Sequence, residues 1–251
     1  MRQIDLNCDM GELKAGQICN FDAAIMPFIS SCNIACGFHS GSPELIAKTI
    51  QTAITHHVKI GAHPSYNDRP NFGRISLQVK RSKLLAELRY QISAVKGMVE
   101  SFGERLHHVK AHGALYNDMV KDQKLANDFV CLVKSIDPNL RILTLAHSQV
   151  VDYCLEHGIS AIHEGFADRA YQAKVQLRSR KFEDALIHTS DKVLSQVQGF
   201  LEGKIRLYDG SSSSIQVDSI CLHSDTKGAV ELSKKIHNYL KSKHVCISAP
   251  A

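Results

Sequence analysis

Short runs of apolar and β-branched residues alternate with longer stretches of helical periodicity along this chain of 251 residues. Strand, helix, strand repetition predicts a parallel sheet, because parallel neighbours need a long crossover between them. The runs that read as strands are 3–6, 31–35, 59–62, 108–111, 141–145, 161–163 and 219–222. Seven such strands, each followed by a helix or long loop, favour an irregular (β/α) barrel over the alternative, an open doubly wound sheet.

Helical stretches connect these runs and carry apolar residues three and four positions apart. The clearest apolar face consists of Leu84, Leu88, Ile92, Val95, Val99 and Phe102. Ser42 followed by Pro43 predicts a helix start, because serine caps an N-terminus and proline fits the first turn. Other helices are expected near 43–57, 124–136, 149–157, 191–202 and 227–240. Because the serine-rich segment 210–214 reads as a loop and not as a linker, we expect one barrel domain over 1–251.

Composition excludes several classes of protein. No window approaches the roughly 18 apolar residues of a membrane span, and no export signal precedes the first strand, so a cytoplasmic protein is expected. The eight cysteines include no C-x-x-C pair and read as reduced, mostly buried residues. The net charge of +5 comes from Lys and Arg interspersed with Asp and Glu, and Trp is absent, so nucleic-acid binding is not expected.

The first strand carries an unusual polar row. Asp5, Asn7 and Asp9 fall on one face by the period of two, while Leu6, Cys8 and Met10 fall on the other. A solvated edge strand would give the same pattern. Strands of a parallel barrel are buried on both faces, however, so such a row needs hydrogen-bond or metal partners that offset its desolvation.

Histidines follow the ends of several expected strands, at His39, His63, His112, His147 and His223. In a (β/α) barrel these ends share one rim, so residues distant in sequence converge there. Imidazoles and carboxylates can hold a divalent metal that activates a bound water, or can act without metal as general acids and bases. The residue types favour zinc or a similar ion, and the candidate ligands are Asp9, His39, His63 and His112.

Glu164 directly follows His163 in the sixth expected strand. The two side chains have opposite parity, so one should face the site and the other the helical layer. Other familiar sites are missing, since the sequence contains no Walker A loop, no G-x-S-x-G elbow and no Rossmann glycine fingerprint.

The chain resembles the LamB/YcsF family, the A subunits of prokaryotic ATP-dependent 5-oxoprolinase. Six ordered motifs carry the resemblance: DLNCDMGE at 5–12, NIACGFHSGSP at 33–43, IGAHPSYNDRPNFGR at 60–74, VKAHGALYN at 109–117, EGFADRAY at 164–171 and ICLHSDTKGAVEL at 220–232. The resemblance implies a seven-stranded, irregular barrel like those of glycoside hydrolases and deacetylases. It also implies ATP-driven opening of 5-oxo-L-proline to L-glutamate, with ATP as co-substrate and B and C subunits as partners.

Candidate roles follow for individual residues. We expect phosphorylation of the lactam oxygen to activate the ring, with attack assisted by Asp9, Glu164 or a metal-bound water and with charge stabilised by Lys110 or a histidine. The expected catalytic residues are Asp9, Glu12, Lys110, Glu164 and Asp225. The expected substrate-binding residues are Asp5, Asn7, Asn33, Arg74, Tyr116, Arg169 and His223.

Four positions depart from the family pattern: Ser42 replaces Asp, Ala111 replaces Pro, Ser224 replaces Gly and Lys227 replaces Pro. The stretch 180–188 is also atypical. Two other functions stay open, the first on fold analogy alone and the second for the case that these positions disable the site. One is a metal-dependent deacetylase or amidohydrolase acting on an N-acyl substrate, and the other is a non-catalytic subunit that binds 5-oxoproline.

Overall fold

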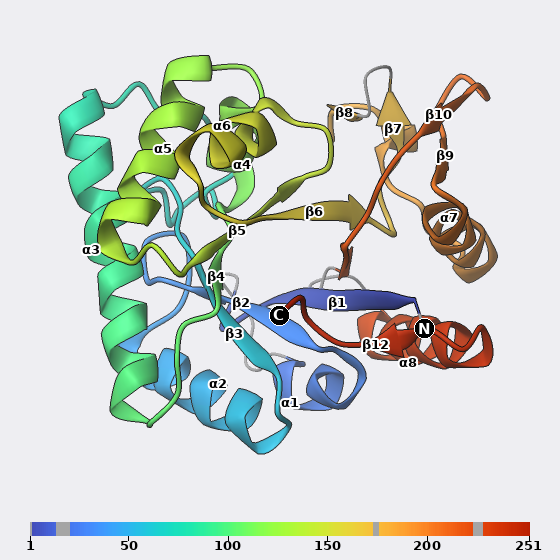
Figure 1. The fold of residues 1–251 in the computed structure, drawn as a ribbon, viewed down its shortest axis with the longest axis horizontal. Helices are drawn as coiled ribbons and strands as arrows, with labels where there is room; N and C mark the ends of the chain where they lie inside the picture. Colours follow the sequence, from blue (N-terminus) through green and yellow to red (C-terminus); the bar gives the residue numbers. More distant parts are fainter. Residues whose placement is uncertain (1, 14–20, 173–175, 223–227) are drawn as a thin grey trace.

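The computed structural model describes residues 2–13, 21–172, 176–222 and 228–251, and its centre is a ring of parallel strands (Figure 1). The ring runs in the order β1-β2-β3-β4-β5-β6-β11 and closes where β11 pairs with β1. Its strands are β1 (Gln3–Met10), β2 (Ser31–Ala35), β3 (Lys59–His63), β4 (His108–Val109), β5 (Arg141–Leu145), β6 (Ala161–Phe166) and β11 (Ser219–Leu222). The predicted seven-stranded barrel is confirmed, and the open sheet is wrong.

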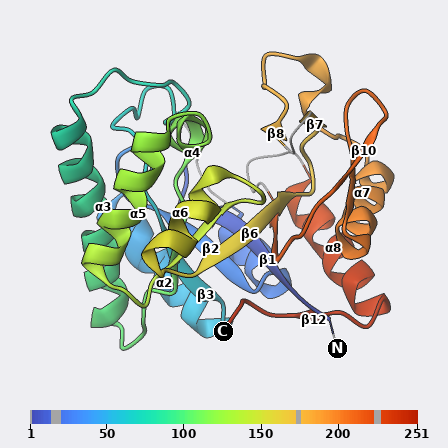
Figure 2. The same cartoon turned by 45° about the horizontal axis from the view of Figure 1, so that its top comes forward.

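Helices connect these strands and lie outside the ring (Figures 1 and 2). They are α1 (Asp22–Ile25), α2 (Pro43–Thr55), α3 (Arg81–Ser101), α4 (Gly113–Met119), α5 (Gln123–Ile136), α6 (Gln149–His157), α7 (Ser190–Glu202) and α8 (Ala229–Ser242), with short 3-10 turns at Met26–Phe28 and Glu183–Ala185. Their apolar faces and the outward side chains of the strands, such as Leu6, Cys8 and Met10, form the hydrophobic core. Among the described residues, no helix has the length and apolar character needed to cross a membrane.

Local signals set the ends of several helices. The Ser42 hydroxyl accepts a hydrogen bond from the Leu45 N–H at 3.2 Å, so the predicted cap of α2 is confirmed. Asp122 caps α5 in the same way, with its carboxylate 2.9 Å from the Leu125 nitrogen. The helix α6 ends at Gly158, whose φ of 63° is left-handed and suits glycine.

Some elements differ from the sequence-based expectation. The first strand continues past Leu6 to Met10, because partners inside the barrel satisfy its polar residues. Segment 210–214 is not entirely a loop, since β10 (Ser212–Ser214) pairs antiparallel with β9 (Lys204–Arg206). A second small hairpin joins β7 (Tyr171–Gln172) to β8 (Gln176–Leu177), and both hairpins lie near α7 (Figure 2). A further strand, β12 (Cys246–Ile247), pairs with the start of β1.

Candidate functional site

The inward side chains of β1 begin a column of polar groups along the barrel interior. At its lower end, Asp5 is 1% exposed and accepts hydrogen bonds from the hydroxyls of Ser30, Ser31 and Ser219 at 2.6, 2.7 and 2.5 Å. Register places these groups together, because Ser219 of β11 lies opposite Asp5. Burial raises the pKa of Asp5, while the three hydroxyls act in the opposite direction.

Amide groups form the next layer of the column. The Asn33 side-chain nitrogen donates to Asn7 Oδ1 at 2.9 Å and to Asp9 Oδ1 at 2.8 Å. The buried ring of His108 donates from Nε2 to Asn33 Oδ1 at 2.7 Å. Gly61 makes room for this ring, since a Cβ there would lie 2.2 Å from His108 Nε2. These contacts fix the orientation of the Asp9 carboxylate from below.

Lys110 lies above this layer between two carboxylates. Its Nζ is 3.0 Å from Asp9 Oδ1 and 2.7 Å from Glu164 Oε1. Burial acts to lower the pKa of Lys110, but the neighbouring Asp9 and Glu164 charges outweigh it and hold that pKa well above its usual value. Tyr116 donates its hydroxyl to Glu164 Oε2 at 2.8 Å. Glu164, and not His163, is therefore the member of that pair that faces the barrel interior.

A second cluster, formed by Glu12, His39, His63 and His112, lies at the C-terminal ends of the strands. One potential ligand atom from each of the four side chains lies within 4.8 Å of all the others. Glu12 Oε1 is 2.9 Å from His39 Nε2 and 3.5 Å from His112 Nδ1, and His112 Nδ1 is 2.9 Å from His63 Nε2. Asp9 adjoins the cluster, with its Oδ2 3.3 Å from His63 Nε2.

The hydrogen bonds of the outer ring nitrogens fix the tautomers of the three histidines in this cluster. His63 Nδ1 donates to the Lys110 carbonyl at 2.8 Å, and His112 Nε2 donates to the Phe72 carbonyl at 2.9 Å. His39 Nδ1 contacts Ser65 Oγ at 2.9 Å, and that hydroxyl already donates to the Tyr66 carbonyl, so His39 is the donor. A neutral imidazole has one N–H, so in each neutral ring the inward nitrogen presents a lone pair.

Burial favours the neutral form of two of these rings. The pKa values of His39 and His112 are lowered well below the usual histidine value, first by desolvation and then by the neighbouring imidazoles. With all three rings neutral, three imidazole lone pairs and one carboxylate point at a common space, where they repel one another unless a cation lies between them. Nitrogen and oxygen donors in this arrangement fit zinc or a similar divalent ion.

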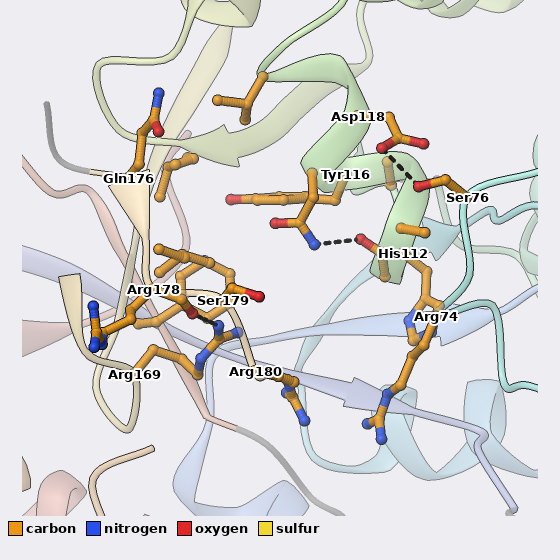
Figure 3. A pocket seen from close by; sticks show the side chains of 18 of the residues that line it. Arg74, Ser76, His112, Tyr116, Asp118, Arg169, Gln176, Arg178, Ser179 and Arg180 are labelled. Carbon is orange, nitrogen blue, oxygen red and sulfur yellow. Dashed lines mark hydrogen bonds between the residues drawn. The ribbon is translucent and has the colours of Figure 1, made fainter. Parts of the chain in front are cut away.

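The two clusters open into a cavity of about 530 Å³. Asp9, Glu12, His63, Lys110 and His112 contribute to its lining, so both clusters reach it. Figure 3 shows Tyr116 and His112 beside the cavity, with Arg74 on one side and Arg169, Arg178 and Arg180 on the other. The cavity therefore joins a buried acid and base centre to a cationic wall.

The structure brings most of the predicted site residues together, although their roles stay predictions. Glu12 adds a carboxylate to the three histidines for which the sequence suggested Asp9 as partner. Asp5, Asn7 and Asn33 do not line the cavity and lie in the column below it, which favours a supporting role over direct substrate contact. Glu164 lies behind Lys110 with no exposed surface. Predicted residues His223 and Asp225 fall outside the described part of the chain, as do Ser224 and Lys227.

Convergence at the rim does not extend to His147. Its side chain is exposed, its backbone φ is 60°, and its Nε2 accepts a hydrogen bond from the Gln216 backbone at 3.2 Å. A turn after β5 thus directs this ring away from the cluster, and the expectation of a shared rim position is wrong here. Sequence reasoning also missed Gly73, where a Cβ would lie 2.9 Å from atoms of both His39 and His112. The sequence feature that could have indicated Gly73 is its position among the polar residues of segment 60–74.

Comparisons with known proteins agree with this architecture. The chain is 40% identical over 247 residues to the A subunit of 5-oxoprolinase from Bordetella parapertussis, covering 98% of each chain. It superposes on the lactam utilization protein of Thermus thermophilus with a TM-score of 0.92 and 32% identity, covering 99% of this chain and 100% of that one. A peptidoglycan N-acetylglucosamine deacetylase domain from Eubacterium rectale shares the fold alone, with a TM-score of 0.52, 10% identity and coverage of 100% and 89%. The LamB/YcsF family profile matches residues 4–251, and the chain belongs to this family.

Proposed function

We propose that this chain is the A subunit of an ATP-dependent 5-oxoprolinase that opens 5-oxo-L-proline to L-glutamate with B and C partner subunits. The central supporting observation is Lys110, a buried cation held between Asp9 and Glu164 at the floor of a cavity. The relative from Bordetella is named as the A subunit of 5-oxoprolinase, and the Thermus structure is a lactam utilization protein. A cyclic amide is thus the substrate class that best combines these observations.

The chemistry needs activation because resonance stabilises an unstrained lactam. In the proposed sequence the lactam oxygen attacks the γ-phosphorus of ATP, the bond to ADP breaks, and ADP leaves with the electron pair. One water adds to the activated carbon and gives a proton to a base. The ring C–N bond then breaks as the nitrogen takes up a proton, which leaves an acyl phosphate. A second water releases phosphate and L-glutamate.

The residues divide these tasks by position. Asp9 lines the cavity and is oriented by Asn33, so it is suited to take a proton from the attacking water. Lys110 is suited to stabilise the negative charge of the transferred phosphoryl group and of the oxygen that water adds to the activated carbon. Glu164, held by the Tyr116 hydroxyl, keeps Lys110 in place and positively charged.

Glu12, His39, His63 and His112 would hold a divalent metal, since their lone pairs converge. Such an ion, when bound, supplies a Lewis acid beside the substrate. Elemental analysis of the purified chain should find about one divalent ion per molecule, as for one four-ligand site. The variant Glu12→Ala should lose most of it, whereas Lys83→Ala, at a side chain that is 69% exposed, should retain it. Equal metal content in both variants would exclude this ligand set.

Reconstitution tests the proposed activity. The purified chain, candidate B and C subunits, ATP and 5-oxoproline should together yield glutamate and phosphate in equal amounts, and omission of any component should stop the reaction. Glutamate formation without ATP would contradict the proposal. Release of acetate from N-acetylated substrates by the chain alone would identify a deacetylase instead, and 5-oxoproline binding without turnover in the complete mixture would identify a binding subunit.

A further inference from the structure

The cavity has more room than the lactam uses. Its volume of about 530 Å³ lies in the range of pockets that hold drug-sized ligands, whereas 5-oxoproline is a five-membered ring with one carboxylate. The groups suited to lactam chemistry occupy the floor, at Asp9, Lys110 and His112. The outer part of the same cavity therefore remains for a second ligand.

Positive charge dominates the lining of the cavity. The cationic residues that line the cavity are Arg74, Lys110, Lys121, Arg169, Arg178, Arg180 and Lys181. The acidic lining residues are Asp9, Glu12 and Asp118. Asp9 faces Lys110, Asp118 accepts hydrogen bonds from Ser76 and Tyr66, and Glu12 Oε1 lies 2.9 Å from His39 Nε2. An anion with several charges would match this wall.

Several contacts anchor the segment that carries Arg180. The Arg178 backbone nitrogen donates to the Ala170 carbonyl at 2.9 Å, and Arg169 Nη2 donates to the Arg178 carbonyl at 2.7 Å. The Arg178 guanidinium pairs with Asp184 and lies 4.1 Å from the ring centroids of Phe182 and Tyr208. The wall is therefore built by packing and backbone pairing before any ligand arrives, which lowers the entropy cost of binding.

Two of these guanidinium groups repel each other. Arg169 is 6% exposed, and its pKa is lowered to about 10, first by burial and next by the charge of Arg180. Its Nε and Nη2 donate to the Ala185 and Arg178 carbonyls. These two hydrogen bonds hold the guanidinium group at the cavity wall. An anion that contacts both arginines would relieve the repulsion, and phosphate oxygens suit the planar guanidinium.

We propose that Arg74, Arg169 and Arg180 bind the phosphate chain of a nucleoside triphosphate across this cavity, with Arg74 on the side of His112 and Arg169 and Arg180 on the other side (Figure 3). This inference rests on the proposed function, in which the lactam is phosphorylated. With the phosphates at the wall and the lactam at the floor, the terminal phosphorus faces inward, toward Lys110. The site uses side-chain guanidinium groups and needs no Walker A loop, whose absence is evident in the sequence.

Calorimetric titration of the full chain with inorganic tripolyphosphate and with ATP tests this site. Both should bind to the unaltered chain, and Arg74→Ala and Arg180→Ala should each weaken binding roughly 10-fold or more, as expected for loss of a charge-assisted contact. Lys83→Ala, which removes an exposed charge that does not line the cavity, should bind like the unaltered chain. Unchanged affinity in both arginine variants would overturn the site, and binding of tripolyphosphate but not ATP would overturn the nucleotide assignment.

Kinetics of the reconstituted complex separate this site from the proposed reaction. Arg180→Ala should raise the KM for ATP roughly 10-fold while the KM for 5-oxoproline changes little. A rise in the lactam KM alone would assign Arg180 to the lactam and overturn the inference. If the unaltered complex forms no glutamate, the proposed function fails, while the titrations with tripolyphosphate and ATP still decide whether the anion site exists.

Discussion

Asp5 and Asp9 lie on the same strand, face the same barrel interior and differ in what surrounds them. Asp5 is enclosed by three serine hydroxyls and does not line the cavity. Asp9 lines the cavity and pairs with Lys110. The neutral donors around Asp5 fit a structural role, whereas the cation and the open space beside Asp9 fit the proton transfer proposed for it. The contrast teaches that the groups supplied by neighbouring strands, and not the residue type, distinguish the two carboxylates.

The largest expected effect comes from Asp9→Asn. The amide keeps the shape and the contact with Asn33 but cannot take a proton, so we expect glutamate formation to fall about 10²- to 10⁴-fold in the reconstituted complex. Thermal denaturation should change little, because Lys110 keeps Glu164 as a partner. Full activity in this variant would exclude Asp9 as a catalytic residue. Asp9 would then have a structural role, as Asp5 does.

Lys110→Met should destabilise the fold by about 3–5 kcal/mol, because Asp9 and Glu164 would lose the cation buried between them. Urea denaturation measures this loss. The double variant Lys110→Met with Glu164→Gln should recover part of the stability, since one unpaired charge is removed, but none of the activity. A single variant as stable as the unaltered chain would show that the ion pairs contribute little.

Asp5→Asn should reverse the pattern of Asp9→Asn. We expect a loss of about 1–3 kcal/mol in the free energy of unfolding, because an amide nitrogen replaces one oxygen that accepts serine hydroxyls. Activity per folded molecule should remain near that of the unaltered complex. Strong inactivation of a fully folded variant would assign Asp5 to the reaction.

The stability difference between the unaltered chain and Asp5→Asn should also depend on pH. Burial raises the folded-state pKa of Asp5 above its unfolded value, so the protonated carboxyl favours the native state. That stabilisation is fully present below the unfolded pKa and is lost as the pH rises through the folded pKa. Asparagine does not titrate, so the stability difference between the two chains should shrink with rising pH in urea denaturation. A difference that grows would contradict the raised pKa.

Ser31→Ala should have the smallest effect. It removes one of two hydroxyl donors to Asp5 Oδ2, while Ser219 remains, so we expect a loss of about 0.5–1.5 kcal/mol and normal activity. Denaturation and glutamate assays on the same preparation measure both quantities. Inactivation without destabilisation would mean that the lower layer of the column acts on Asp9 directly.

The sequence predicted the barrel well because its signals are local. Alternation along β1 placed Asp5, Asn7 and Asp9 on one face, and the ends of β2, β3 and the segment after β4 carried His39, His63 and His112. It could not assign the partners of the first strand, since Ser30, Ser31 and Ser219 meet Asp5 only through strand register. Nor could it foresee that the turn at His147 points outward.

The pairing of β11 with β1 has a consequence for how the protein is made on the ribosome. Ser219 and Cys221, from late in the chain, contact Asp5 and Lys110, so the inner walls near those residues stay incomplete until segment 219–222 has been synthesised. A nascent chain that lacks this segment cannot close the ring between β6 and β1, and its Asp5 lacks the Ser219 hydroxyl. Translation products that stop before this segment should lack a competent centre, whatever the quality of their early folding.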